Sequence, residues 1–532
     1  MCGILAIIGK GKDPQLVRDL SKRMSHRGPD ESDLFLTEKG NIVSSERLSI
    51  IDLNSGKQPI QGTDGAWMVH NGEIYNHQEL RDDVLRAHSF RTKSDSEVIV
   101  HLYEEFGYDF CNMLDGDFAF VIINGDDFMA ARDPLGVKPL YYGLDERGRM
   151  YFASEMKSIT DQCVTLSTFP PGHFYTANSG FVKYYRPDYE DYLKADQELN
   201  LEAINSTLTN AVRKRLMADV PLAVLLSGGL DSSLIASITA RIVKEQDKKL
   251  HSFAIGLDAN APDIIAARKA AEFIGIEHHE VFFTVDEGIA VLGKLIWHLE
   301  TYDIISVRAS VPMYFLSKAI SDLGIKVVLS GEGADEIFGG YLYFRNAPSA
   351  EEFQKETIER VQKLFTADLL RVDKSTMAQG LETRVPFLDT DFLDVVMTIN
   401  PEEKQPQSHQ NKEKFVLRKA FDVSENAYLP DEILWRQKEQ FSDGVGYEWI
   451  DQLKAYCASQ VTDEQLAAAA VAFPYNPPTT KEAYLYRTIF HKHYPEMNAA
   501  QTVRKWIPRW QENEDPSGRA HAAHVGTAKN SH

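Results

Sequence analysis

Short runs of apolar residues separated by turn-forming residues dominate the chain from its start to about residue 190. Gly, Asn and Asp interrupt these runs at short intervals, as is typical of β-strands and their connecting turns. The clearest runs are GILAIIG (3–9), GAWMVHNG (65–72), FAFVIING (118–125) and YFASE (151–155). Apolar residues recur at helical spacing in two segments of this region, 13–27 and 94–107. The pattern predicts layered β-sheets covered by helices, which is an α+β arrangement.

The pattern changes at Leu222, after which short strands and helices alternate. Apolar strands are expected at 223–227, 250–257, 278–283 and 325–331, and the helices between them include 233–245 and 262–275. Regular alternation of this kind predicts an α/β domain with a parallel, doubly wound sheet. Helical spacing continues through most of residues 351–505, so we expect a helical C-terminal part.

Polar and acidic residues between 187 and 204 separate the two patterns. We therefore predict one domain over residues 2–190 and a second over residues 205–512. Residues 513–532 are polar and rich in small side chains, so we expect this tail to be disordered.

Composition excludes several classes of protein. The formal net charge of −21 argues against general binding to nucleic acid or to an anionic membrane. No stretch approaches the length of about 18 apolar residues that a membrane-spanning helix needs. The 4 cysteines are widely spaced, which predicts neither a zinc site nor a disulfide framework. A reducing, cytoplasmic location is the default expectation.

Cys2 directly follows the initiator Met, and its small side chain is of the kind that permits removal of that Met. Removal would leave a cysteine with a free α-amine, whose pKa of about 8 lets it act as a base near neutral pH. One residue would then supply both nucleophile and base. Taken alone, Cys2 fits a buried cysteine at the start of a strand better, because buried cysteines are common.

Four further motifs favour the catalytic interpretation of Cys2: HRGPD (26–30), SERL (45–48), NGEIYN (71–76) and SDSE (94–97). This set, in this order after Cys2, resembles the class II glutamine amidotransferase domain over about residues 2–190. The resemblance implies an αββα sandwich of the N-terminal-nucleophile hydrolase fold. It also implies catalytic roles for Cys2, Asn71 and Gly72, the last two as oxyanion donors through the Asn71 side chain and the Gly72 N–H. The resemblance implies that glutamine is bound by Arg47 at its carboxylate, by Glu73 and Asp95 at its α-ammonium group, and by Asn71. Ser45 departs from the His that some relatives have before this Arg.

A second motif, SGGLDSS (227–233), lies between a predicted strand and a predicted helix. Glycines allow the backbone to approach a ligand closely, and N–H groups at a helix N-terminus attract anions. The spacing is neither that of a Walker A loop nor that of a G-x-G-x-x-G loop. It resembles the PP-loop of ATP pyrophosphatases, which cleave ATP between its α and β phosphates. The candidate ATP-binding residues of this loop are Ser227, Gly228, Gly229, Asp231, Ser232 and Ser233.

The acidic motif SGEGADE (330–336) follows another predicted strand, at the edge where ligands bind in parallel sheets. Carboxylates beside a phosphate site call for a cation, and Mg²⁺ prefers oxygen ligands. We assign Asp231 and Asp335 to Mg²⁺, and Glu332 as a candidate base or ammonia-positioning group. An acidic cap for the following helix would explain Asp335 but less easily the whole motif.

By family resemblance, further residues complete the nucleotide site. Leu225, Ser252, Ile255, Ser330 and Gly331 are expected to line it, and Arg308 and Lys438 to bind the departing pyrophosphate. Segment 370–389 also matches the family and carries Arg371, Lys374 and Arg384, for which an ordinary surface position is the simpler expectation.

The whole pattern, over about residues 2–512, resembles the glutamine-hydrolysing asparagine synthetases of the bacterial B type. ETRVPFLD (382–389) and WRQKEQFSDGVGYEWI (435–450) are the most specific segments. The resemblance implies the conversion of glutamine, aspartate and ATP to asparagine, glutamate, AMP and pyrophosphate, through a β-aspartyl-AMP intermediate. It also implies a sheltered path for ammonia and a homodimer.

Two other functions stay open at this point. The chain could be a related amidotransferase that adenylates a different carboxylic acid. It could also be a non-catalytic binding protein, against which the presence of both Cys2 and Asp231 argues.

Overall fold

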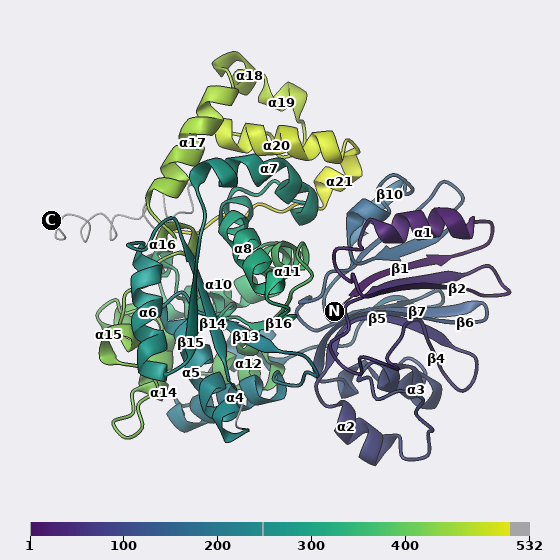
Figure 1. Cartoon of the computed structure of the whole chain (residues 1–532), viewed down its shortest axis with the longest axis horizontal. Coiled ribbons are helices and arrows are strands. Elements are labelled where there is room, and N and C mark those ends of the chain that lie inside the picture. Colours follow the sequence, from purple (N-terminus) through teal and green to yellow (C-terminus); the bar gives the residue numbers. More distant parts are fainter. Residues whose placement is uncertain (1, 247–248, 511–532) are drawn as a thin grey trace.

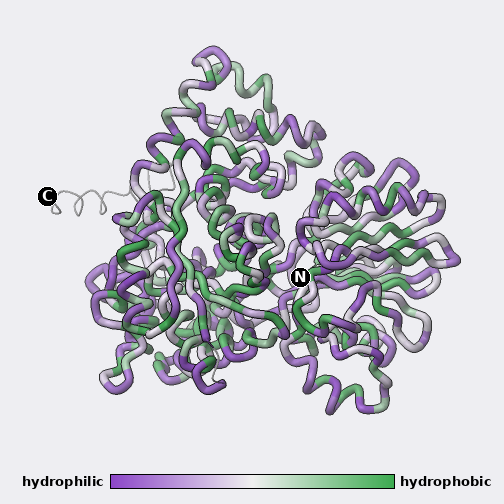
Figure 2. The backbone as a smooth tube through the Cα atoms, viewed as in Figure 1, coloured by the Kyte–Doolittle hydropathy of each residue, from purple (hydrophilic) through white to green (hydrophobic). Residues whose placement is uncertain are grey.

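The computed structural model describes residues 2–246 and 249–510, and the expectation of disorder in 513–532 lies outside them. Figure 1 shows two parts: a layered β-rich part that contains the N-terminus, and a larger part built around a parallel sheet and covered by helices. In Figure 2 the hydrophobic stretches follow the strands of both parts, and hydrophilic stretches follow many of the outer loops. None of the described helices has the length and apolar character needed to cross a membrane.

The N-terminal part contains two six-stranded antiparallel sheets, with orders β10-β8-β9-β1-β3-β2 and β12-β11-β7-β6-β5-β4. The strands of the first sheet are β1 (Cys2–Ile8), β2 (Glu31–Leu36), β3 (Ile42–Arg47), β8 (Tyr141–Leu144), β9 (Met150–Ala153) and β10 (Thr165–Thr168). Those of the second sheet are β4 (Ile60–Gln61), β5 (Trp67–Ile74), β6 (Gly116–Asn124), β7 (Asp127–Arg132), β11 (His173–Thr176) and β12 (Gly180–Lys183).

The inner faces of these two sheets share one apolar core. It contains Ile4 and Val43 from one sheet and Val69 and Val121 from the other, all fully buried. Helix α1 (Pro14–Lys22) packs on the outer face of the first sheet, while α2 (His77–Glu79) and α3 (Glu97–Phe106) lie beyond the second (Figure 1). The arrangement is the αββα sandwich that the sequence predicts.

Helix α1 is shorter than the predicted segment 13–27. It begins after Asp13, whose side chain accepts a hydrogen bond from the Gln15 N–H, and it ends at Lys22. Residues 23–27 form turns instead, because the chain bends so that the Arg27 guanidinium can donate to the Cys2 carbonyl at 3.2 Å. A tertiary contact therefore overrides the local helical pattern.

The second part contains a five-stranded sheet in the order β15-β14-β13-β16-β17, and all its neighbouring strands pair in parallel. Its strands are β13 (Leu222–Leu225), β14 (His251–Gly256), β15 (Glu277–Phe282), β16 (Val327–Leu329) and β17 (Glu382–Arg384). The helices that accompany the sheet are α4 (Leu201–Lys214), α5 (Leu230–Glu245), α6 (Pro262–Ile274), α7 (Val285–Leu299), α8 (Ile304–Asp322) and α9 (Ala334–Phe338).

Helices cover both faces of this sheet, because successive side chains of its strands point to opposite faces. Val224 packs in the core that contains α4, α5 and α6, whereas its neighbours Ala223 and Leu225 pack in the core that contains α7 and α8. The prediction of a doubly wound parallel sheet is confirmed.

The C-terminal part is mostly helical, as predicted. Its helices are α10 (Ala350–Lys363), α11 (Asp368–Met377), α12 (Thr390–Met397), α13 (Pro401–Lys404), α14 (Phe415–Phe421), α15 (Asp431–Leu434), α16 (Phe441–Gly444), α17 (Glu448–Gln460), α18 (Asp463–Ala467), α19 (Ala469–Ala472), α20 (Lys481–His493) and α21 (Met497–Gln501). Strand β17, within this region, is the element that the pattern misses. Its three residues, Glu-Thr-Arg, contain no apolar side chain, so no hydrophobic periodicity could reveal it.

Candidate functional site

Cys2 is the first residue of β1 and lies between the two sheets, 4% exposed. Its backbone N–H donates to Asn71 Oδ1 at 2.9 Å, and Gln58 Nε2 donates to its Sγ at 3.7 Å. Burial raises the pKa of the Cys2 thiol. The thiol therefore needs a nearby base before it can attack a substrate. Gln58 was not singled out by the sequence, because no motif surrounds it.

The Asn71–Gly72 step on β5 provides hydrogen-bond donors beside Cys2. Asn71 is fully buried, and among the described residues nothing accepts a hydrogen bond from its Nδ2. Gly72 has a φ of +148°, and a Cβ at this position would lie 2.0 Å from the carbonyl oxygen of Asp117. Only glycine fits here, so the close pairing of β5 with β6 requires it. The unused amide of Asn71 is the type of donor that a developing oxyanion needs.

Arg47 lies directly opposite Cys2 in the pairing of β1 with β3. Its guanidinium donates to the carbonyl oxygens of Ile51 and Asp52 at 3.1 and 2.7 Å and pairs with Glu31 at 2.7 Å. These three contacts hold the planar guanidinium group in one orientation.

Glu73 and Asp95 are both buried, at 2% and 3% exposure. Asp95 Oδ2 accepts a hydrogen bond from the Ile74 N–H at 2.8 Å. This bond connects the segment that carries Asp95 to the residue that follows Glu73. Burial, together with the neighbouring carboxylates Glu382 and Asp95, raises the pKa of Glu73 well above its ordinary value. A cationic ligand group between these carboxylates would lower the pKa of Glu73 again, since an opposite charge favours the ionised form.

A second site lies at the carboxyl ends of β13, β14 and β16. A cavity of about 130 Å³, partly open to solvent, lies there. The predicted residues that line it are Leu225, Ser227, Gly229, Asp231, Ser232, Ile255, Ser330, Gly331, Glu332, Asp335 and Lys438. Apolar side chains of α8, Met313 and Leu316, form part of the wall.

Four predicted residues are not among those lining this cavity: Gly228, Ser233, Ser252 and Arg308. Gly228 allows the loop to turn close to α6 instead. Its φ is +70°, and a Cβ there would lie 2.3 Å from the Ala266 backbone. Ser233 and Ser252 are fully buried. Arg308 is held by Glu482, to which its Nε donates at 2.7 Å, and it borders a different cavity.

The SGGLDSS loop leads into the N-terminus of α5, which begins at Leu230 after Gly229. The hydroxyl of Ser232 folds back over the loop, where it accepts a hydrogen bond from the Ser227 N–H at 3.2 Å. The first residues of α5, Leu230, Asp231 and Ser232, line the cavity, and N–H groups at a helix N-terminus are the kind of donors that bind phosphate groups in other proteins.

Asp231 and Asp335 converge on one ammonium group, that of Lys414. Lys414 Nζ lies 2.5 Å from Asp231 Oδ2 and 2.6 Å from Asp335 Oδ1, and Lys438 Nζ lies 2.6 Å from Asp335 Oδ2. Although burial opposes the shift, Lys414 and Lys438 lower the pKa of Asp335 to about 2. Lys414 is 2% exposed and was missed, because nothing in its local sequence distinguishes it from a surface lysine.

This pair of carboxylates also suits a hard cation. Both acids supply oxygen atoms, they meet at one point, and Asp231 Oδ1 is buried with no hydrogen-bond partner in the described part of the chain. Mg²⁺ is bound through one or two carboxylates together with substrate phosphates. The residues present therefore fit the metal.

Glu332 faces the same cavity and a neighbouring one. Its Oε1 accepts a hydrogen bond from Arg371 at 2.6 Å, and burial raises its pKa. The neighbouring cavity, which shares Glu332, Asp335 and Lys438 with the first, is also lined by Asp368 and Arg371.

The expectation that Arg371, Lys374 and Arg384 lie on the surface is wrong. They are 5%, 0% and 0% exposed, respectively. Lys374 pairs with Glu300, and Arg384 donates to Glu382 at 2.6 Å. Lys374 and Arg371 pair with residues 74 and 39 positions away, Glu300 and Glu332, which no local pattern can reveal.

Buried ion pairs join the two parts of the molecule between the sites. Arg27 of the N-terminal part contacts Asp373 at 2.7 Å, and Arg384 of the second part lies 3.5 Å from Glu73 Oε1. The backbone carbonyl of Arg384 accepts from the Ser330 N–H at 2.9 Å. One residue thus contacts both candidate sites.

Comparison with known proteins places this geometry in context. Residues 1–178 match the model of a glutamine amidotransferase domain, and residues 203–352 and 345–515 match that of asparagine synthase. A probable glutamine-hydrolysing asparagine synthetase of Dictyostelium discoideum is 49% identical over 560 residues, which cover 99% of this chain and 100% of that protein. Glutamine-hydrolysing asparagine synthetase 1 of Arabidopsis thaliana is 49% identical over 548 residues, covering 98% and 93%.

Among solved structures, the glutamine phosphoribosylpyrophosphate amidotransferase from B. subtilis is 18% identical and has a TM-score of 0.31. The match covers 52% of this chain and 81% of that one, and similarity at this level carries no argument about function. The two family models and the full-length relatives do support the assignment of the chain to a family. The chain belongs to the family of glutamine-hydrolysing asparagine synthetases.

Proposed function

We propose that the N-terminal site hydrolyses glutamine and that the cavity of the second part activates aspartate with ATP. The observation that carries the first half is the Asn71 side chain. Its Oδ1 holds the Cys2 nitrogen at 2.9 Å, while its Nδ2 has no partner among the described residues. One amide group therefore orients the nitrogen that would become the catalytic base and offers a donor to the oxyanion.

In this reaction the freed α-amine of Cys2 takes the thiol proton, and the thiolate attacks the side-chain amide carbon of glutamine. Ammonia leaves and a thioester forms, which water then hydrolyses to glutamate and the free thiol. Arg47 binds the substrate carboxylate, and Glu73 and Asp95 bind its α-ammonium group. The pairing of charges supports these roles, because burial and the carboxylates Glu382 and Asp95 raise the pKa of Glu73 even with Arg384 nearby, and a cationic ligand group would favour its ionised form.

In the second site, the N–H groups at the start of α5 and the serines of its loop bind the ATP phosphates. The aspartate β-carboxylate attacks the α-phosphorus and pyrophosphate leaves, which gives β-aspartyl-AMP. Ammonia then displaces AMP and forms asparagine, with Glu332 placed to orient it or accept its proton. Leu225, Ile255 and the apolar side chains of α8 suit the adenine base.

Mg²⁺ would be held by Asp231 and Asp335, and when bound it would neutralise negative charge on the phosphates. Lys438 supplies a further cation for the departing pyrophosphate. Arg308 would need to leave Glu482 before it could take the same role.

We further propose that residues 2–190 and 205–512 act as the two functional domains, in a cytoplasmic homodimer. Free thiols support a reducing location, since all 4 cysteines are unpaired in the structure.

One variant and the wild-type protein test how the reaction is divided between the two sites. Cys2→Ala is expected to abolish glutamine-dependent asparagine formation and to retain formation from ammonium chloride, measured as asparagine by amino-acid analysis. Loss of both activities in a folded variant would contradict two separable sites. Pyrophosphate release by the wild-type protein should require aspartate, and release that depends instead on another acid would reject the substrate assignment.

A further inference from the structure

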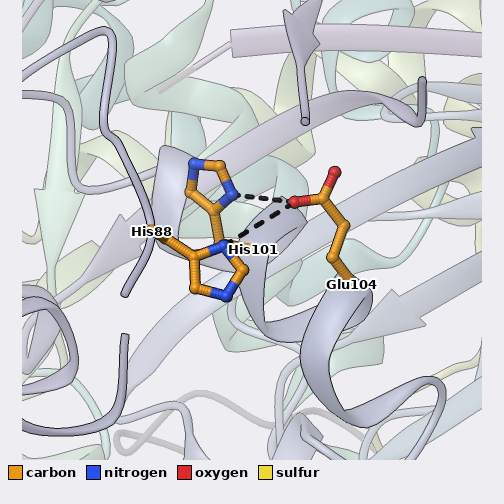
Figure 3. Close-up of side chains that lie close together, drawn as sticks. All are labelled: His88, His101 and Glu104. Carbon is orange, nitrogen blue, oxygen red and sulfur yellow. Dashed lines mark hydrogen bonds and ion pairs between the residues drawn. The ribbon is translucent and has the colours of Figure 1, made fainter. Parts of the chain in front are cut away.

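Three side chains converge in the N-terminal part, outside both sites described above. Figure 3 shows His88, His101 and Glu104, of which the last two lie on α3. Each offers one ligand atom, and these atoms all lie within 4.8 Å of one another. The function proposed above uses none of the three.

We infer that His88, His101 and Glu104 bind a divalent transition-metal ion, with Zn²⁺ as the best match. Two imidazoles and one carboxylate form a recurrent zinc ligand set that leaves one position for water. Glu104 Oε2 lies 2.9 Å from His101 Nδ1 and 4.0 Å from His88 Nδ1. In a tetrahedral site with zinc–ligand bonds of about 2.0–2.2 Å, two ligand atoms lie roughly 3.3–3.6 Å apart. Shifts of about half an ångström would bring both separations into that range.

Each of the three ligands already has an outer partner. His101 Nε2 lies 3.6 Å from Glu97 Oε1, and His88 Nε2 lies 3.4 Å from Glu105 Oε2. The other oxygen of Glu104, Oε1, accepts a hydrogen bond from the Asp64 N–H at 2.8 Å. Carboxylates behind imidazole ligands, and hydrogen bonds to ligating carboxylates, are what orients the ligands in established metal sites.

Burial favours an ion over a solvated cluster of side chains. The side chains of His101 and Glu104 are 2% and 4% exposed, whereas that of His88 is 16% exposed and leaves an entry path. His88 lies in the segment that leads to Asp95, and His101 lies on the helix that follows it. A bound ion would therefore fasten the segment that carries Asp95. The cysteine pattern predicted no zinc site, and this site uses no cysteine.

A second trio on the parallel sheet provides a matched control. His251, Glu277 and His279 also have ligand atoms within 4.8 Å, but the side chain of Glu277 is 52% exposed. His251 Nδ1 and His279 Nε2 form a hydrogen bond with each other at 3.0 Å. Because His101 Nδ1 and Glu104 Oε2 are likewise hydrogen-bonded, at 2.9 Å, the exposure of Glu277 is what distinguishes this trio from the proposed site.

Zinc binding by the full-length, chelator-treated protein tests the inference. Equilibrium dialysis against micromolar Zn²⁺ would be done in the Cys2→Ala background, which removes the active-site thiol as a competing ligand. We expect one zinc per chain. We expect at least a 100-fold loss of affinity in His88→Ala and in Glu104→Gln, and unchanged affinity in His279→Ala. Glu105→Ala, which removes only an outer carboxylate, should weaken binding by about tenfold.

Ammonia-dependent asparagine formation and the circular dichroism spectrum should be unchanged in all four variants, which shows that they fold. Absence of stoichiometric zinc binding, or equal affinity in the wild-type, His88→Ala and Glu104→Gln proteins, would overturn the inference. Loss of binding in His279→Ala alone would do so too, since it would place the ion on the parallel sheet.

Discussion

Lys414 offers the sharpest test of the second site, because it is the ammonium group on which Asp231 and Asp335 converge. Lys414→Met keeps the length and much of the volume of the side chain but removes its charge. The two carboxylates would then face each other, with Lys438 still paired to Asp335 at 2.6 Å. Negative charge left in the cavity would repel the triphosphate.

The size of the effect follows from Asp335. Lys414 and Lys438, acting against burial, lower its pKa from 3.8 to about 2. At about 1.4 kcal/mol per unit, the net preference for the ionised carboxylate, after the opposing effect of burial, is about 2–3 kcal/mol. Because Lys414 contacts both acids, its loss should cost about 1–3 kcal/mol of that stabilisation, or roughly a 10–100-fold loss of adenylation rate. Since the pKa is depressed, the stabilisation is present above about pH 4 and is lost only as the pH falls toward 2.

The assay is aspartate-dependent pyrophosphate release at neutral pH, measured beside glutamate production from glutamine. Lys414→Met should slow the first and leave the second near the wild-type rate. Higher Mg²⁺ concentrations should restore part of the lost rate, because the metal can replace the missing cation. Lys419→Met, whose side chain is 43% exposed and pairs with Asp422, is the matched control and should behave as wild type. Unchanged pyrophosphate release in Lys414→Met would refute the reasoning.

Three further variants test other parts of the structure. Gly72→Ala should lose glutaminase activity and about 2–4 kcal/mol of stability, because its Cβ would lie 2.0 Å from the Asp117 carbonyl oxygen; a melting temperature like that of the control Gly293→Ala, which has open space, would contradict this. Asp231→Asn should stop pyrophosphate release and spare glutaminase activity, and continued release would show that Asp231 is not needed for the metal or the nucleotide. Arg384→Met should raise the glutamine KM more than it lowers kcat with ammonium chloride, because Glu73 loses a cation 3.5 Å away; the variant should also be less stable by about 3–5 kcal/mol. A KM for glutamine that does not change in a folded Arg384→Met protein would show that Arg384 has only a structural role.

Much of the architecture was predictable because it rests on local regularities. The alternation of apolar and polar residues identified β1, β5, β6 and the strands β13 to β16. Helical spacing predicted the helix α6 and its end at Gly275, and the structure places that glycine in the left-handed conformation, with a φ of +77°. Strand β17 escaped detection, since its backbone is held by β16 and its side chains are all polar.

In the candidate sites, too, some residues were predictable from local patterns and others were not. Motifs of adjacent residues identified Cys2, Asn71, Gly72 and the SGGLDSS loop, because the chemistry of those residues depends on short spacing along the chain. Lys414 lies 183 residues from Asp231, and Gln58 lies 56 residues from Cys2, so their roles depend on contacts that form only on folding. The burial of Arg371, Lys374 and Arg384 likewise depends on contacts that form only on folding.

By itself, the sequence therefore determined the two folds and the candidate site residues that lie in short motifs. The tertiary structure alone decided which charges neutralise one another inside the protein, and that Arg384 touches both sites. The physical reason is that hydrophobic periodicity and turn chemistry act over a few residues, whereas the pairing of buried charges is determined by distances in space between residues far apart in the chain.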